Sequence, residues 1–173
     1  MSKQNNPKEE LQARPFTITR EFAAPQAMVW RAWTEAGQLQ QWFGPKGFKT
    51  VTLSFDLRVG GGLHTCMRSP DGGEIWGKWM FREVVPPRRL VWINSFSDRD
   101  GGISRHPWNP AWPLELWTET TFAESNANTV VTLKWAPHNA TDEEIRTFNA
   151  AHESMTNGWG GTFDQLATHL NCK

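Results

Sequence analysis

Residues 141–170 read TDEEIRTFNAAHESMTNGWGGTFDQLATHL, and they set the architecture of the whole chain. Thr141 and Glu144 have the spacing of a capping box, in which two side chains satisfy backbone N–H groups at a helix start. After them, residues that form one mostly apolar stripe recur at steps of three and four: Ile145, Phe148, His152, Met155, Trp159, Phe163, Leu166 and Leu170. Residues with this period share one face of a helix. The segment therefore predicts one long C-terminal helix of about seven turns.

The residues before this helix have the patterns of strands and turns. Apolar residues alternate with polar ones, or run together between turn residues, in seven segments: 16–22, 51–57, 63–69, 75–85, 90–96, 114–122 and 129–135. Between the first two segments, Pro25 opens one short helix, and a second one ends before Gly44. This order predicts an α+β fold in which an antiparallel sheet of about 6–7 strands carries the helices, including the long C-terminal one, on one face.

Length and charge restrict the classes of function. The chain has 173 residues, a length that fits one domain, which we place at residues 15–171 after a disordered leader over residues 1–14. Lys and Arg number 18, as do Asp and Glu, so the formal net charge is zero. A neutral chain has no long-range field to attract nucleic acid or an anionic membrane. We therefore expect neither as a partner.

The predicted location is a reducing cytoplasm. Cys66 and Cys172 lie far apart and neither belongs to a C-x-x-C pair, so neither a disulfide framework nor a zinc site is indicated. The first residues lack the apolar region of a signal peptide, and no apolar run approaches membrane-spanning length. We expect no cofactor and no membrane insertion.

The aromatic composition favours an apolar cavity. The chain has 11 Trp and 10 Phe but no Tyr. Aromatic side chains suit walls that are apolar without being tightly filled, and the absence of Tyr keeps phenolic hydroxyls out of those walls. Chance drift in composition explains the missing Tyr equally well.

Several short motifs resemble one known family. They are REFAAP at 20–25, VWRAWT at 29–34, WFGP at 42–45, DLRVGG at 56–61, MRSPDGG at 67–73, WGK at 76–78, PPRRLV at 86–91 and Gly158-Trp159. In this order they are similar to homologues of the activator of heat-shock protein 90 ATPase, within the START-like, pollen-allergen-like superfamily. The resemblance spans about residues 16–170 and implies a helix-grip fold. Proteins of this superfamily hold lipids, polyketides or hormones in a cavity, and some are cyclases.

The candidate ligand-binding residues come from both sides of the expected cavity. The helix stripe supplies Phe148, His152, Met155, Trp159 and Phe163. The strands supply Met67, Trp79, Trp92 and Trp117. Because the segment 75–85 is apolar on both faces, its pattern does not decide which face points into the cavity. Our hypothesis is that these residues bind a small apolar molecule, with a plain hydrophobic core as the alternative.

His152 and the helix glycines have competing interpretations. His152 could orient a ligand carbonyl or act as a general base, but we favour a core histidine bonded to a backbone carbonyl or to water. Each glycine inside a helix costs about 1 kcal/mol relative to Ala. For Gly158, Gly160 and Gly161 we expect close packing on the sheet to be the reason, with a helix kink or a mouth for the ligand as the alternatives.

Two other classes of function stay open. A cyclase or hydrolase would use His152 as its base, but no second acid–base residue lies on the same stripe, so we assign no catalytic residue. A chaperone-associated module would need an exposed apolar patch, for which the loop with Trp108 and Trp112 is the candidate. His64 and Cys66 share a strand face without a third ligand, so no metal site is predicted.

Overall fold

The computed structural model describes residues 11–172 and contains four helices and eight strands within that range. The strands are β1 (Phe16–Phe22), β2 (Lys49–Phe55), β3 (Gly62–Arg68), β4 (Glu74–Val85), β5 (Arg89–Ser97), β6 (Ile103–Ser104), β7 (Glu115–Ser125) and β8 (Asn128–His138). The helices are α1 (Gln26–Thr34), α2 (Ala36–Trp42), α3 (Asp142–Ala150) and α4 (His152–Asn171). The expected order of one strand, two helices, a run of strands and a C-terminal helical segment is confirmed.

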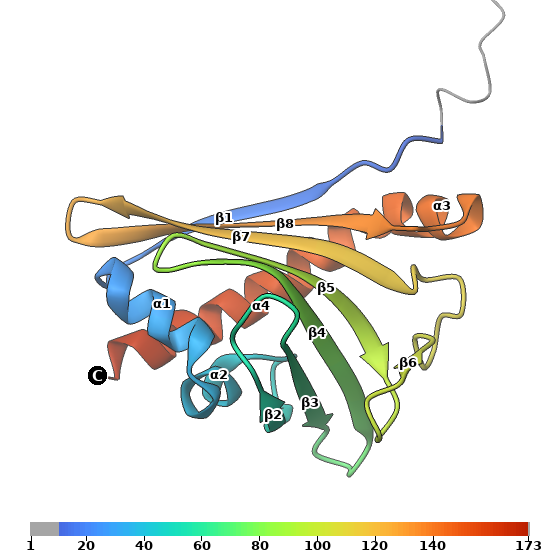
Figure 1. The fold of residues 1–173 in the computed structure, drawn as a ribbon, viewed down its shortest axis with the longest axis horizontal. Coiled ribbons are helices and arrows are strands. Elements are labelled where there is room, and N and C mark those ends of the chain that lie inside the picture. The colour runs from blue at the N-terminus through green and yellow to red at the C-terminus, as the bar shows by residue number, and fades with distance from the viewer. Residues whose placement is uncertain (1–10, 173) are drawn as a thin grey trace, which may run out of the picture.

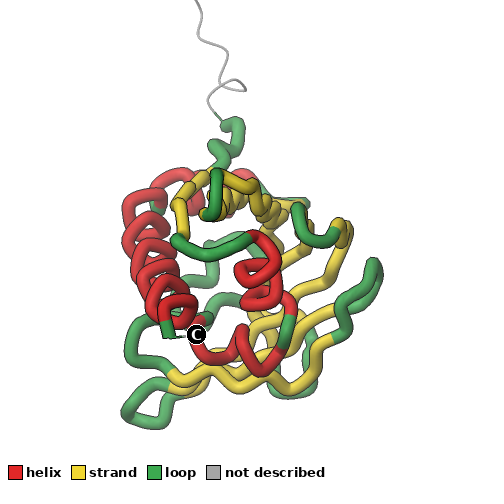
Figure 2. Tube along the Cα trace, turned by 90° about the vertical axis from the view of Figure 1, so that its left-hand side faces the viewer, coloured by secondary structure: helices red, strands yellow, loops and turns green. Residues whose placement is uncertain are grey.

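All strands belong to one antiparallel sheet with the order β1–β8–β7–β5–β4–β3–β2, and the two-residue β6 pairs with β5. The sheet curves strongly, and α4 runs diagonally across its concave side (Figure 1). A view turned by 90° shows the strands bending around the space that the helices close (Figure 2). This is the predicted helix-grip arrangement.

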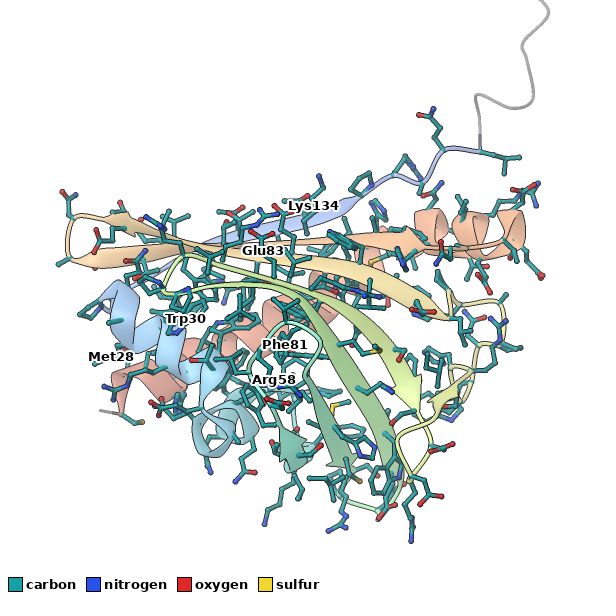
Figure 3. The ribbon with its side chains drawn as sticks, in the orientation of Figure 1. Met28, Trp30, Arg58, Phe81, Glu83 and Lys134 are labelled. Carbon is teal, nitrogen blue, oxygen red and sulfur yellow. The ribbon has the colours of Figure 1, made fainter. Side chains whose placement is uncertain are left out.

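Alternation along the strands separates the two faces of the sheet. In β7, buried residues alternate with half-buried ones, so Leu116 and Thr118 face inward and Trp117 faces outward. The register places Thr118 between Trp92 of β5 and Trp135 of β8 on the same concave row. Figure 3 shows Phe81 on the helix side of the sheet and Lys134 on the opposite side.

The expectation of one continuous helix over residues 141–170 is wrong at one point. The capping box of Thr141 and Glu144 is present, but α3 ends at Ala150 and α4 begins at His152. At Ala151 (φ −100°, ψ 7°) the backbone N–H bonds to the carbonyl of Phe148, three residues back, and the chain changes direction. The break lets α3 stay beside β8 while α4 crosses the concave face.

The core is dominated by tryptophan and phenylalanine. Trp33 and Trp42 are fully buried and lie 4.8 Å apart between ring centroids, and the Nε1–H of Trp42 donates to the carbonyl of Ala32 at 2.9 Å. Phe122 packs edge-on against Trp33 at 5.7 Å. The helices α1 and α2 are thereby fixed against the sheet and form one end of the concave space.

Two further expectations concern the turns and the leader. The turn at residues 60–62 needs glycine because a Cβ on Gly61 would lie 2.3 Å from the carbonyl oxygen of Asp56, and one on Gly62 2.3 Å from that of Trp79. Most of the predicted leader, residues 1–10, lies outside the described residues. The part that is described reaches back to the break between α3 and α4, where the Arg14 backbone N–H donates to Oδ1 of Asn149 at 2.8 Å. Within residues 11–172, no helix combines the length and apolar composition that crossing a bilayer requires.

Candidate functional site

A cavity of about 520 Å³ lies between the concave face of the sheet and α4. Most of its lining is apolar: Phe43, Gly44, Pro45, Met67, Trp76, Gly77, Trp79, Phe96, Trp112, Leu116, Trp135, Ala151, Met155, Gly158 and Trp159. The polar lining consists of Thr65, Asn94, Ser95, His106, Asn109, Ser154 and Thr162. Among the described residues, no Lys, Arg, Asp or Glu lines the cavity. The space therefore suits an uncharged, largely apolar molecule.

The helix side of the cavity comes from one face of α4. Ala151, Met155 and Trp159 point inward at steps of four. Met155 and Trp159 belong to the predicted stripe, whereas Ala151 takes the inward place that the stripe gave to His152. Next to them lie Ser154 and Gly158, which are exposed and therefore sit at the mouth of the cavity. The helix presents the large side chains of Met155 and Trp159 toward the interior and the small residues Ser154 and Gly158 at the opening.

Close packing does not explain the glycines of α4. A Cβ added to Gly158, Gly160 or Gly161 would meet no atom within 4 Å, other than those of its own helix backbone and chain neighbours, so the expectation of tight contact is wrong. Of the three, Gly158 lines the cavity. Across from it, the loop residue Gly44 accepts hydrogen bonds on its carbonyl from Thr162 at 3.2 Å and Gln165 at 2.7 Å. These bonds hold α4 against the loop that forms the opposite rim.

An aromatic wall surrounds the deep part of the cavity. The ring of Trp159 meets Trp135 edge-on at 5.4 Å and Phe43 at 6.2 Å. The ring of Trp79 packs against Phe43 at 5.2 Å and stacks on Trp92 at 4.3 Å. Rings that support one another in this way stay in place without a ligand, so the cavity is preformed.

The predicted site residues fall into three groups. Met67, Trp79, Met155 and Trp159 line the cavity. Trp92, Phe148 and Phe163 are fully buried but lie in the layer behind the lining. Contrary to expectation, Trp117 lies on the other face of the sheet, where it contacts His138, because its neighbour Leu116 takes the inward position.

His152 also differs from the prediction of a cavity residue. Its Nε2–H donates to the carbonyl oxygen of Arg14 at 2.9 Å, and its ring lies between Phe16 at 6.0 Å and Phe148 at 5.5 Å. The break at Ala151 turns this side chain toward the N-terminal segment instead of the cavity. The backbone-bonded role that we favoured from the sequence therefore describes its geometry, and a general base in the cavity does not.

The structure adds His106, which the sequence did not single out. Its Nδ1 accepts hydrogen bonds from the backbone N–H groups of Trp108 and Asn109, both at 3.1 Å. Its ring packs against Phe96 at 4.6 Å and lines the cavity. Burial lowers the pKa of His106 below its ordinary value, because the charged imidazolium loses hydration. The ring is thus neutral near pH 7, with its proton on Nε2.

His106 lies in the connection between β5 and β7, residues 98–114, and several contacts stabilise this His106 segment. Arg105 forms an ion pair with Glu144 at the start of α3, at 2.5 Å. Trp112 packs on Phe148 at 5.8 Å, and Asn109 Oδ1 accepts from the backbone N–H of Ala111 at 3.2 Å. A long connection between strands is a common place for functional residues, and this was the one available signal for His106.

Thiol and metal chemistry have little support. Cys66 is buried, and burial raises the pKa of its thiol, which keeps it protonated and unreactive. Within the part of the chain that the structure describes, no group of three His, Cys, Asp or Glu side chains could hold a metal ion.

Comparison with known proteins identifies similar sequences and folds. The family model for "Activator of Hsp90 ATPase homolog 1-like protein" matches residues 23–171. A crystal structure of a Nitrosomonas europaea protein is 30% identical, with a TM-score of 0.69 over 91% of this chain and 94% of that one. The solution structure of an Arthrobacter aurescens protein is 23% identical, with a TM-score of 0.78 over 94% of this chain and 89% of that one.

A third similar structure is a Mycobacterium smegmatis protein, 24% identical with a TM-score of 0.74 over 94% of each chain. The structures below 25% identity bear on the fold alone, and they agree with it. The comparison with curated proteins found no match.

Proposed function

This chain belongs to the Activator of Hsp90 ATPase homolog 1-like family, and from that premise we propose that it binds one small apolar molecule, of the acyl, aromatic or polyketide-like kind, in the cavity between the sheet and α4. The family's fold supports a ligand cavity. The molecule would lie with its body against Trp79, Met155 and Trp159, which line the space from both sides.

The observation that carries the proposal is the cavity itself. Its volume of about 520 Å³ falls in the range of about 300–1,000 Å³ that is typical of sites for small molecules. A solid hydrophobic core leaves few voids larger than a water molecule. An apolar space of this size with a mouth at Gly158 is therefore better explained by a ligand than by packing.

The alternative of a cyclase or hydrolase has less support. Such an enzyme needs an acid–base pair within reach of the substrate. His152 is bonded to Arg14 away from the cavity, and no carboxylate lies on the lining among the described residues. We therefore keep binding, without a reaction, as the proposed activity.

A chaperone-associated module is the second candidate, and one observation favours it. Trp108 is 73% exposed and Ile103 is 43% exposed, both on the segment between β5 and β7. An exposed tryptophan suits a protein contact. The matched family is named after an activator of the Hsp90 ATPase, and that activity belongs to the protein so named.

Two measurements test the binding proposal. Native mass spectrometry of the protein purified from its own source should detect a bound small molecule, which would identify the ligand class. Nile red, an uncharged apolar dye, should bind the folded protein saturably with one site per chain and quench tryptophan emission. A folded protein that binds no dye, and carries no co-purifying molecule, would contradict the proposal.

A further inference from the structure

Some polar groups of the cavity are hydrogen-bonded within the protein, and others are not. Thr162 donates its hydroxyl hydrogen to carbonyl oxygens of its own surroundings, at Gly44 and Gly158. By contrast, neither the side-chain amide of Asn94 nor Nε2 of His106 has a hydrogen-bond partner among residues 11–172, although both residues line the cavity. Unsatisfied polar groups on a ligand cavity commonly fix the orientation of what binds there.

His106 is restricted to the role of a donor. Because Nδ1 accepts from two backbone N–H groups, it cannot carry a proton, and the neutral ring must hold its hydrogen on Nε2. The side of the ring that bears Nδ1 faces its own backbone turn, so Nε2 is directed away from that turn. A fixed tautomer of this kind offers one N–H and no acceptor.

Asn94 lies close to the same place. It pairs with Trp79 of β4 and Leu116 of β7, two buried residues that also line the cavity, so its side chain is on the concave face. Phe96 follows two residues later on the same face of β5 and packs against the ring of His106 at 4.6 Å. The amide and the imidazole therefore belong to one end of the cavity, where β5 meets the His106 segment.

We propose that this end recognises an uncharged hydrogen-bond acceptor on the ligand, such as a ketone, ester or amide carbonyl oxygen. The Nε2–H of His106 donates to that oxygen, the amide of Asn94 provides a second donor, and the apolar body of the ligand extends toward Trp79 and Trp159. This inference rests on the proposed binding function and narrows its ligand class.

The absence of formal charge on the described lining excludes a carboxylate as the preferred group. A carboxylate that leaves water costs a large free energy unless a cation is paired with it, and no Lys or Arg of the described chain lines the cavity. A hydrocarbon is disfavoured for a different reason, because it would leave the Nε2–H and the amide without partners. A neutral carbonyl carries no charge and still accepts hydrogen bonds from the Nε2–H and the amide.

Three probes of nearly equal shape test the inference by displacement of Nile red: 2-acetylnaphthalene, 2-ethylnaphthalene and 2-naphthoate. The measured quantity is the ratio of the hydrocarbon's Kd to the ketone's Kd, compared between proteins so that the hydration of the free probes cancels. His106→Asn keeps an acceptor near the backbone N–H groups of Trp108 and Asn109 but removes the distal donor. We expect this ratio to fall about 3- to 10-fold in His106→Asn, and to fall also in Asn94→Leu.

The matched control is His138→Asn, since His138 packs on Trp117 on the other face of the sheet and does not line the cavity. Its ratio should equal that of the unmodified protein. If all three probes bind equally, or if neither His106→Asn nor Asn94→Leu changes the ratio, the inference fails while the binding function stands. If the unmodified protein binds neither the dye nor any probe, the proposed function fails and the inference falls with it.

Discussion

Trp79 stacks on Trp92 with their ring centroids 4.3 Å apart and their planes inclined by 24°. Trp79 reaches the cavity, whereas Trp92 lies in the layer behind it. The cavity wall is thus two aromatic layers thick, and the outer layer holds the inner one in position. This explains how a space of about 520 Å³ stays open in a domain of this size.

The first prediction concerns the buried stripe behind the cavity. Phe148 is fully buried and packs on Trp112 and His152. Phe148→Ala should lower the free energy of unfolding by about 3–5 kcal/mol, as is typical of large core truncations. Urea melts give the value, with Trp108→Ala as the exposed control, which should change stability by less than about 0.5 kcal/mol. A loss below about 1 kcal/mol for Phe148→Ala would mean that the site repacks without a cavity.

A second prediction uses the glycines of α4 as a matched pair. Gly158→Leu and Gly160→Leu place the same side chain in the same helix, and neither added Cβ meets an atom within 4 Å outside the local helix backbone. Both should fold and gain roughly 0.5–1 kcal/mol of stability from better helix propensity. Because Gly158 lines the mouth and Gly160 does not, only Gly158→Leu should weaken Nile red binding, by about tenfold or about 1.4 kcal/mol.

Titrations of Gly158→Leu and Gly160→Leu with Nile red measure the two affinities. Equal weakening by both would show that the effect comes from the helix and not from the mouth. Unchanged affinity in Gly158→Leu would place the opening elsewhere.

The stripe and the strand periods allowed the fold to be predicted, because helix and sheet leave different spacings in the sequence. Met155 and Trp159 were found in this way. Trp117 was misplaced because β7 carries apolar residues on both faces, and a shift of one position exchanges the faces. The break at Ala151 left no sequence signal, since Phe148 and Met155 keep the helical spacing on either side of it. The place of His106 in the cavity could not be derived from the sequence because it depends on the packing of its ring on Phe96 and Trp112, and these contacts form only in the folded chain.

A third prediction concerns pH. Burial lowers the pKa of His106 in the folded protein, whereas in the unfolded chain the ring titrates near about 6.5. Between these values the unfolded chain binds more protons, so the contribution of His106 to stability is fully present above pH of about 6.5 and is lost as pH falls through the folded pKa. Protonation would also set a hydrogen on Nδ1 against the N–H groups of Trp108 and Asn109.

Thermal melts at pH 7.5 and 5.5 test this, with His106→Asn as the reference that contains every other titrating group. The unmodified protein should lose more stability on acidification than the variant does. An equal loss in both proteins would show that His106 contributes nothing to the pH dependence.

A fourth prediction addresses the chaperone alternative. Trp108 is 73% exposed, but a single exposed aromatic side chain is a smaller surface than stable protein partners usually need. Mixing the protein with the Hsp90 homologue of its own source should therefore leave ATP turnover unchanged. A saturable, stoichiometric acceleration that Trp108→Ala abolishes would reverse the order of the two proposed functions.

The last prediction separates the two histidines. His152 holds the N-terminal segment through Arg14, and Gln at this position can still place an N–H near the Arg14 carbonyl, whereas Ala cannot. His152→Ala should therefore lower stability by about 1 kcal/mol, the net value of one hydrogen bond. It should also speed amide exchange at Arg14, whose N–H is bonded to Asn149 beside the same break. His152→Gln should retain most of both properties. Because the ring of His152 does not line the cavity, Nile red should bind both variants with the affinity of the unmodified protein. Loss of dye binding in a folded His152→Gln protein would return this residue to the ligand site and revive the enzymatic alternative that depends on it.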